Sequence, residues 1–134
     1  MKRLLLLLIF LAPLPAWADG FGFETPSGNI YCNGHISDGG GISCEIVVRQ
    51  GPPARPKPSS CRQSWGHSFS LQGSGSAELI CGPKPSRVGY SEIAAYGQSG
   101  TFGDITCYSE RTGFTCENRS GHGFFLSRRK QEIF

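Results

Sequence analysis

The stretch GDITCYSERTGFTCENRSGHGFFLSR, from Gly103 to Arg128, decides how this chain is interpreted. Its two cysteines, Cys107 and Cys116, lie nine positions apart on either side of a Thr-Gly turn. Short runs of alternating character that flank a turn are typical of a β-hairpin. A disulfide between these cysteines would therefore join the two strands of one hairpin.

A looser copy of the same pattern lies in the first half of the chain. It consists of SGNIYC at Ser27–Cys32, ISCEI at Ile42–Ile46 and GHSFSL at Gly66–Leu71. The Gly-His-x-Phe-x-Leu motif begins at Gly66 and again at Gly121. The spacings between the blocks differ, so the pattern leaves open whether the halves are a true duplication or separate uses of one hairpin pattern.

The first eighteen residues have the character of a secretory signal peptide. Lys2 and Arg3 precede the apolar run Leu4–Leu11, and Ala16–Ala18 supplies an A-x-A cleavage pattern. The apolar run is shorter than the about 20 residues of a membrane-spanning helix. We therefore predict a signal peptide over residues 1–18, a single β domain over residues 19–134, and no membrane insertion after cleavage.

Six cysteines lie in the predicted mature part, and an even number in an exported chain favours disulfides over free thiols. Zinc binding, the competing interpretation, would want cysteine pairs two to four residues apart, and the chain has none. We predict no metal and no other cofactor. Short sequence distance favours these pairs: Cys32–Cys44, Cys61–Cys81 and Cys107–Cys116.

Charge and composition exclude some classes of function. The formal net charge of +3 falls to about +1 once Lys2 and Arg3 are removed, because eleven basic residues then face ten acidic ones. A nucleic-acid-binding domain normally has a strong basic excess, so we expect no nucleic-acid partner. Apolar residues make up 38% of the chain and glycines number 19, which leaves a modest core that disulfides would support.

The remaining pattern is one of short strands separated by turns. Ile42–Arg49 alternates clearly, and Ala77–Cys81 and Phe124–Ser127 are further strands, whereas the glycine-rich Gly97–Gly103 is expected to be a turn. Val88–Tyr96 could form a strand or one helical turn. Helical periodicity is almost absent. This predicts an all-β fold: a small disulfide-stapled sandwich or open barrel of short antiparallel hairpins, whose two halves could be related.

The segment Gly51–Pro58 contains four prolines and should be extended, since proline cannot donate to a β-ladder. We interpret it as a stiff connector that ends near Cys61, rather than as a proline-rich ligand for another protein.

Three segments carry a resemblance to a known family. They are FETPSGNIYC at Phe23–Cys32, Tyr96-Gly97, and the stretch from Gly113 through GHGFFLSR, which ends at Arg128. The chain resembles a family of small secreted bacterial proteins of unknown function, over nearly the whole mature part. The resemblance implies a secreted, disulfide-bonded domain. It implies no activity and no catalytic residues.

No catalytic constellation stands out in the sequence. Gly73–Ser76 reads as a flexible turn rather than a nucleophile elbow, and a carboxylate pair such as Asp104 and Glu117 stays open. His67 and His122 occupy equivalent motif positions and could face each other. As candidate binding residues we take two histidines and three aromatic residues that could reach the surface: Trp65, His67, Tyr96, Tyr108 and His122.

These observations predict an exported, periplasmic or secreted, non-enzymatic domain that binds a protein or an envelope component through its loops. An inhibitor of a cell-wall lytic enzyme is one concrete version. A small hydrolase of an envelope polymer is the alternative, and a structural role in the envelope is a third.

Overall fold

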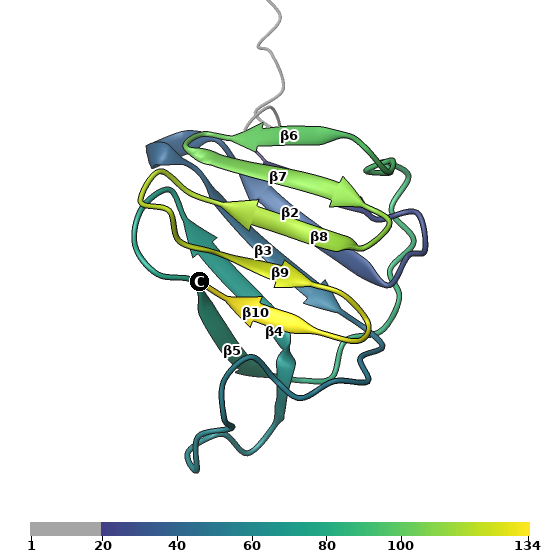
Figure 1. Ribbon diagram of the computed structural model, residues 1–134, viewed down its shortest axis with the longest axis vertical. Helices are drawn as coiled ribbons and strands as arrows, with labels where there is room; N and C mark the ends of the chain where they lie inside the picture. Colours follow the sequence, from purple (N-terminus) through teal and green to yellow (C-terminus); the bar gives the residue numbers. More distant parts are fainter. Residues whose placement is uncertain (1–19) are drawn as a thin grey trace, which may run out of the picture.

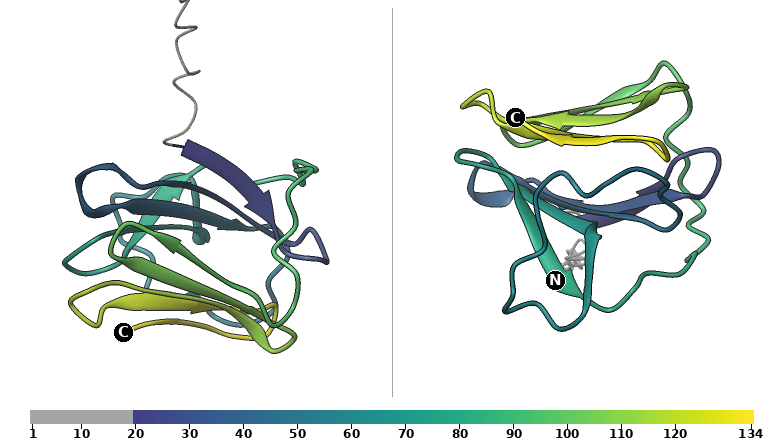
Figure 2. Two further views of the ribbon diagram at one scale, coloured as in Figure 1. Left: turned by 90° about the horizontal axis from the view of Figure 1, so that it is seen from above. Right: turned by 60° about the horizontal axis from the view of Figure 1, so that its bottom comes forward.

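The computed structural model describes residues 20–134, so the predicted signal peptide lies outside the described residues. Two five-stranded antiparallel sheets pack face to face, each built as a meander of consecutive strands (Figures 1 and 2). The first sheet contains β1 (Gly20–Glu24), β2 (Ile30–His35), β3 (Gly41–Ile46), β4 (Ser64–Gln72) and β5 (Glu78–Gly82). The second contains β6 (Ser99–Phe102), β7 (Ile105–Glu110), β8 (Gly113–Glu117), β9 (Gly123–Leu126) and β10 (Gln131–Ile133). The all-β prediction is confirmed in its sandwich form, since the sheets stay open.

The core lies between the two sheets and follows from alternation along the strands. In β3 and β7, every second side chain is buried, which is the pattern of a sheet with one covered face. Phe69 of β4 and Phe124 of β9 meet across the layers with ring centroids 5.6 Å apart. Apart from the short 3-10 turn Ser37–Gly39, the elements among residues 20–134 are strands, and none of the described helical structure is long and apolar enough to cross a membrane.

The three predicted disulfides are all present. Cys32–Cys44 joins β2 to β3 and Cys107–Cys116 joins β7 to β8, each across directly opposed strand positions with Cα atoms 4.1 Å apart. Cys61–Cys81 ties the loop before β4 to β5, with Cα atoms 5.8 Å apart. Three disulfides indicate an oxidising environment for the folded protein.

The two sequence copies occupy corresponding places in the two sheets. Cys44 is opposed by Phe69 in the first sheet, as Cys116 is by Phe124 in the second. Two residues away on each strand, at the next pair that points into the core, Ile42 is opposed by Leu71 in the first sheet and Phe114 by Leu126 in the second. The spacing differs because residues 47–63 form a long connection between β3 and β4, whereas β8 and β9 are joined by a short turn. The halves are therefore equivalent in strand order, in the register of their central strands and in the position of one disulfide each, whereas Cys61–Cys81 has no counterpart in the second sheet.

Several boundaries differ from the sequence-based expectations. Ser99–Phe102, expected to be part of a turn, forms the edge strand β6, because it needs only one partner and Phe102 reaches the core. β10 was not expected at all. Strand β3 ends at Ile46, so Val48 does not continue the buried face and is 41% exposed. Within the ambiguous segment Val88–Tyr96, Ile93 makes an isolated bridge to Glu24.

The proline-rich segment is a connector, as expected. It belongs to no strand, and backbone groups along it are held by side chains of other elements. The indole of Trp65 donates to the carbonyl of Arg55 (2.8 Å), and the amide of Ala54 donates to Oε1 of Gln131 (2.8 Å). These bonds fix the connector against the end of the sandwich.

Candidate binding cleft at one end of the sandwich

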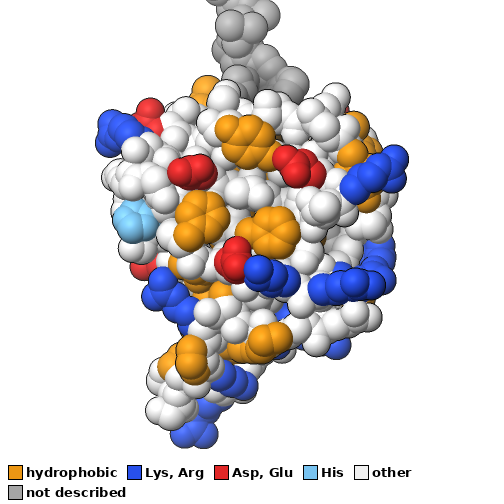
Figure 3. Space-filling model, viewed as in Figure 1, with side chains coloured by type: hydrophobic (Ala, Val, Ile, Leu, Met, Phe, Trp, Pro, Cys, Tyr) orange, Lys and Arg blue, Asp and Glu red, His pale blue; other side chains and the backbone are white. Residues whose placement is uncertain are grey.

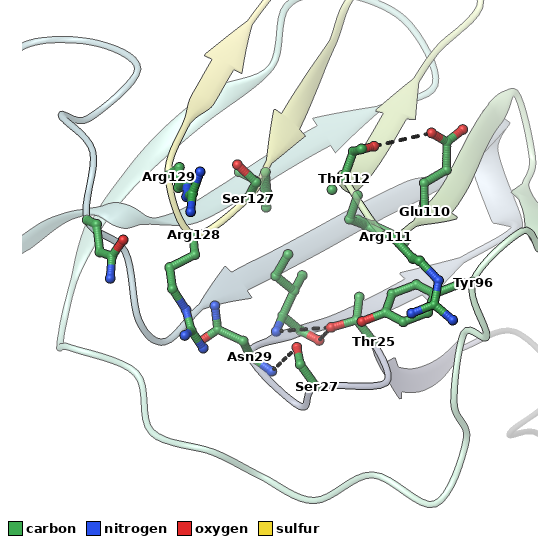
Figure 4. Close-up of a pocket in the computed structure, with 15 residues that line it drawn as sticks. Thr25, Ser27, Asn29, Tyr96, Glu110, Arg111, Thr112, Ser127, Arg128 and Arg129 are labelled. Atoms are coloured by element: carbon green, nitrogen blue, oxygen red, sulfur yellow. Dashed lines mark hydrogen bonds between the residues drawn. The ribbon is translucent and has the colours of Figure 1, made fainter.

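In an antiparallel meander, alternate turns lie at the same end of the sheet. The β1–β2, β7–β8 and β9–β10 turns and the chain after β3 therefore come together at one end of the sandwich. They surround a cleft of about 420 Å³, which Figure 4 shows in close-up. Its floor is formed by apolar core side chains and its rim by polar and charged side chains of the turns.

The β1–β2 turn is a rigid wall of this cleft. The Thr25 amide donates to the carbonyl of Ile30 (2.9 Å), and the Gly28 amide donates to the carbonyl of Thr25 (2.8 Å). Gly28 has φ of +71°, a conformation that favours glycine. The buried Asn29 side chain then donates to the carbonyl of Val48 (2.9 Å) and accepts from its amide (2.8 Å). This pair of bonds clamps the turn to the chain that leaves β3.

The β9–β10 turn carries two arginines at its tip. Its base is closed by Ser127, whose amide and hydroxyl both donate to the carbonyl of Lys130 (2.8 and 3.0 Å). The Arg128 carbonyl accepts from the Gln50 amide (2.7 Å), which fixes the turn against the first sheet. Figure 4 shows the Arg128 side chain directed across the cleft toward Asn29.

The β7–β8 turn supplies the third arginine. The guanidinium carbon of Arg111 lies 5.0 Å from the ring centroid of Tyr96, within the range of a cation–π contact. Tyr96 is 39% exposed and sits at the end of the segment that crosses from one sheet to the other. On the same turn, the Thr112 hydroxyl donates to Glu110 (3.5 Å). Arg111 is therefore held beside an aromatic ring at the rim of the cleft (Figure 4).

The cleft has an excess of positive charge. Its lining contains Arg111, Arg128 and Arg129 but one carboxylate, Glu110. Within residues 20–134 the salt bridges are Arg119–Asp104 (3.5 Å) and Lys130–Glu132 (2.8 Å), so the three cleft arginines have no carboxylate partner in the described part of the chain. The planar guanidinium group matches carboxylate and phosphate in geometry. The arrangement is chemically suited to an anionic ligand.

Of the five sequence-predicted binding residues, the structure brings Tyr96 into this cleft and distributes the others elsewhere. Trp65 holds the proline-rich connector. Nδ1 of His67 lies 2.7 Å from the carbonyl of Ile46. Tyr108 is 44% exposed on the outer face of the second sheet, where hydrophobic and acidic side chains alternate (Figure 3). The five residues stay a prediction for binding, but they do not form one surface.

The other chemical candidates are also dispersed. His67 lies in the middle of β4, whereas His122 lies in the turn before β9, where its amide donates to Oδ1 of Asn118 (3.1 Å). Asp104 forms its ion pair with Arg119. Among the described residues, no three His, Cys, Asp or Glu side chains gather as metal ligands would.

The three cleft arginines were not predicted from the sequence, and they share one property: they lie on alternate turns of the second sheet, which are at the same end of that sheet. Arg111 belongs to the second turn of the β6–β10 meander, and Arg128 and Arg129 to the fourth. The sequence feature that could have indicated this basic cleft was the presence of arginine on each of two alternate turns. The strands between these turns, β8 and β9, were both predicted from the sequence, so this signal was present there; the sequence did not show that the β1–β2 turn of the other sheet lines the same cleft.

An open two-sheet sandwich that is stapled by three disulfides and carries a basic cleft at one end defines a rigid scaffold that presents loops. This chain belongs to the family described as a family of unknown function (DUF6636), whose family model matches residues 3–134. That match confirms the expected membership of a family of unknown function. No curated protein and no solved structure matches the chain.

Proposed function

We propose that the protein is an exported, non-enzymatic binding domain that holds a carboxylate- or phosphate-bearing group of an envelope component or partner protein in the end cleft. The observation that carries this proposal is the set of three arginines around one cleft, Arg111, Arg128 and Arg129, which have no carboxylate partner among residues 20–134. Charge-assisted bonds to arginine are stronger than neutral ones, and bidentate contacts add directional specificity.

The rigidity of the cleft supports binding. Asn29 locks one wall to Val48, and Ser127 closes the turn that carries Arg128. The backbone at Gly51 also packs closely against the β9–β10 turn. A Cβ on Gly51 would lie 2.2 Å from the carbonyl oxygen of Arg129, so glycine is needed there. A preorganised site loses little conformational entropy when a ligand binds.

The proposal is tested with two anionic probes, polyglutamate for carboxylates and polyphosphate for phosphates. The charge reversal Arg128→Glu with Arg129→Glu should weaken binding at least tenfold, because each lost charge-assisted bond costs about 1.5–3 kcal/mol. The matched control reverses Arg55 and Arg62, two exposed arginines on the connector before β4. Equal losses in both double variants would show nonspecific attraction and overturn the assignment of the cleft.

The inhibitor version gives this proposal a specific partner. Glycosidases that cut cell-wall polymers generally use a pair of carboxylates, and the turn that carries Arg128 and Arg129 offers the complementary charge. The oxidised protein should then inhibit a lysozyme in a dose-dependent way, and the reversal of both arginines should remove the inhibition. Full lysozyme activity at a large excess of the protein refutes this version and leaves the anion-binding assay to decide the broader one.

The hydrolase alternative makes the opposite prediction. It requires the purified oxidised protein alone to release soluble fragments from peptidoglycan. Turnover of the polymer would overturn the proposal of a binding domain.

A further inference from the structure

A second hollow lies on the outer face of the first sheet, away from the end cleft. It encloses about 480 Å³ and shares no lining residue with the cleft. Its floor is formed by β2, β3, β4 and β5, and its wall is the segment that leaves β5 and passes back over the sheet. We name this hollow the Glu45 groove.

The floor of the Glu45 groove is a row of side chains at matching register positions. Tyr31 of β2 is opposed by Glu45 of β3, Glu45 by Ser68 of β4, and Ser68 by Ile80 of β5. The Ser68 hydroxyl donates a short hydrogen bond to Oε2 of Glu45. Because residues at these positions point to the same face of the sheet, they form one continuous strip.

The wall of the groove is anchored rather than loose. Pro83 and Pro85 stiffen it. Further along, the Tyr90 hydroxyl and the Asn33 side chain of β2 exchange two hydrogen bonds (2.9 and 3.1 Å). The rings of Tyr31 and Tyr90 lie 6.0 Å apart, so Tyr90 packs beside Tyr31, which lines the groove. The groove therefore exists before any ligand binds.

The Glu45 carboxyl group lies half buried on the floor of the groove. Glu45 belongs to an outer sheet face that would otherwise be open to water, and its burial raises its pKa, while the Ser68 hydrogen bond and the charge of His67 act in the opposite direction. Burial also raises the pKa of Tyr31, with a further rise from Glu45. Glu45 accepts the Ser68 hydrogen bond but has no ion-pair partner among residues 20–134, so its carboxylate can accept further hydrogen bonds from a ligand.

We propose that the Glu45 groove binds a neutral saccharide unit. A sugar ring offers hydroxyl groups that both donate and accept, and the groove offers the same mixture: the acceptor Glu45, the hydroxyls of Ser43, Ser68 and Tyr31, and the donor Lys84. A cationic ligand fits less well, because Lys84 lines the groove and His67 lies close enough to interact with Glu45. The Tyr31 ring provides an apolar surface for the face of a sugar.

The groove is built for binding rather than cleavage. Glycoside hydrolysis usually needs two carboxyl groups on either side of the bond, and Glu45 is the one carboxylate among the described residues that line this groove. The site is separate from the cleft of the proposed function, so the two can fail independently.

The test is a titration of the oxidised, isotope-labelled protein with chitotetraose and maltotetraose, at concentrations up to about 10 mM because single sugar sites are weak. Amide signals of Tyr31, Glu45 and Ser68 should shift with saturation for at least one probe. Signals of Arg111 and Arg128 in the end cleft should stay in place. No saturable shift with either sugar, or shifts confined to the end cleft, would overturn the proposal.

Three variants make the assignment specific. Glu45→Ala and Ser68→Ala should each weaken the sugar at least tenfold, which corresponds to about 1.4 kcal/mol. The matched control is Glu78→Ala, an exposed carboxylate on β5 outside the groove lining, which should keep the affinity. Methylammonium serves as the cationic probe, and saturable shifts of the groove signals with it but not with the sugars would refute a saccharide site. Spectra of each variant without ligand verify the fold.

Discussion

Replacing the core disulfide Cys107–Cys116 by two serines should destabilise the protein much more than replacing Cys61–Cys81 in the same way. Loop length alone predicts the reverse order. The cysteines of the two pairs are 9 and 20 positions apart, which corresponds to about 2.6 and 3.3 kcal/mol of unfolding free energy in the chain-entropy relation. The difference must therefore come from the surroundings of the sulfur atoms.

The core pair lies in apolar surroundings. Cys107 and Cys116 are 3% and 0% exposed, and Cys116 is opposed by Phe124. A buried hydroxyl without a full set of hydrogen bonds costs about 1–3 kcal/mol, so two serines add about 2–6 kcal/mol to the loop contribution. At the other site, Cys81 is exposed, and the sulfur of Cys61 lies 3.6 Å from the Gln63 carbonyl, which a serine hydroxyl could use.

The assay is urea unfolding in non-reducing buffer, followed by far-ultraviolet circular dichroism. The matching double alanine variants isolate the effect of polarity, because they open the same loops without burying a hydroxyl. The serine-minus-alanine difference should be at least about 2 kcal/mol for Cys107–Cys116 and close to zero for Cys61–Cys81. If the two differences are equal, or larger at the Cys61–Cys81 site, the reasoning from core burial is wrong.

Three further predictions concern the clamp, the core and the Glu45 groove. Asn29→Ala removes both bonds to the Val48 backbone and should cost about 2–3 kcal/mol in urea unfolding; an unchanged midpoint would show that the clamp is dispensable. Phe124→Ala removes a fully buried ring from between the sheets and should cost about 3–5 kcal/mol, and a loss below about 1 kcal/mol would contradict the tight packing. For Glu45, burial raises the pKa in the folded state above the ordinary 4.5, so its contribution to stability is present below the unfolded-state pKa and is lost as pH rises through the folded-state pKa. Glu45→Gln should therefore melt at a higher temperature than the wild type near neutral pH and at about the same temperature below pH 4.5, and the opposite trend would refute the burial argument.

The sequence predicted the features that depend on near neighbours in the chain. Each disulfide closes a loop of at most 20 positions, so its partners could be chosen from spacing and hairpin geometry. Alternation in ISCEI was enough to place β3, because one covered face imposes a period of two. The repeated cysteine and Gly-His-x-Phe-x-Leu motifs also marked the strands that turned out to be equivalent in the two sheets.

Edge strands were harder to recognise. Ser99–Phe102 and Gln131–Ile133 are short, and each pairs on one side, so their sequences carry little hydrophobic alternation and much of the polarity of a turn. Their strand conformation is set by the neighbour that supplies hydrogen bonds, β7 in one case and β9 in the other.

The sequence by itself determined the all-β class and the three disulfide pairs, because these depend on local alternation and short loops, and it left open whether the two halves are related. The tertiary structure alone decided where the two candidate binding sites, the end cleft and the Glu45 groove, are formed. The β1–β2 turn and the turns that carry Arg111 and Arg128 line one cleft because the two sheets pack face to face, and the segment Pro83–Ser86 lines the Glu45 groove together with β2, β3 and β4. Both results join segments that are distant in sequence, and no local pattern encodes that distance.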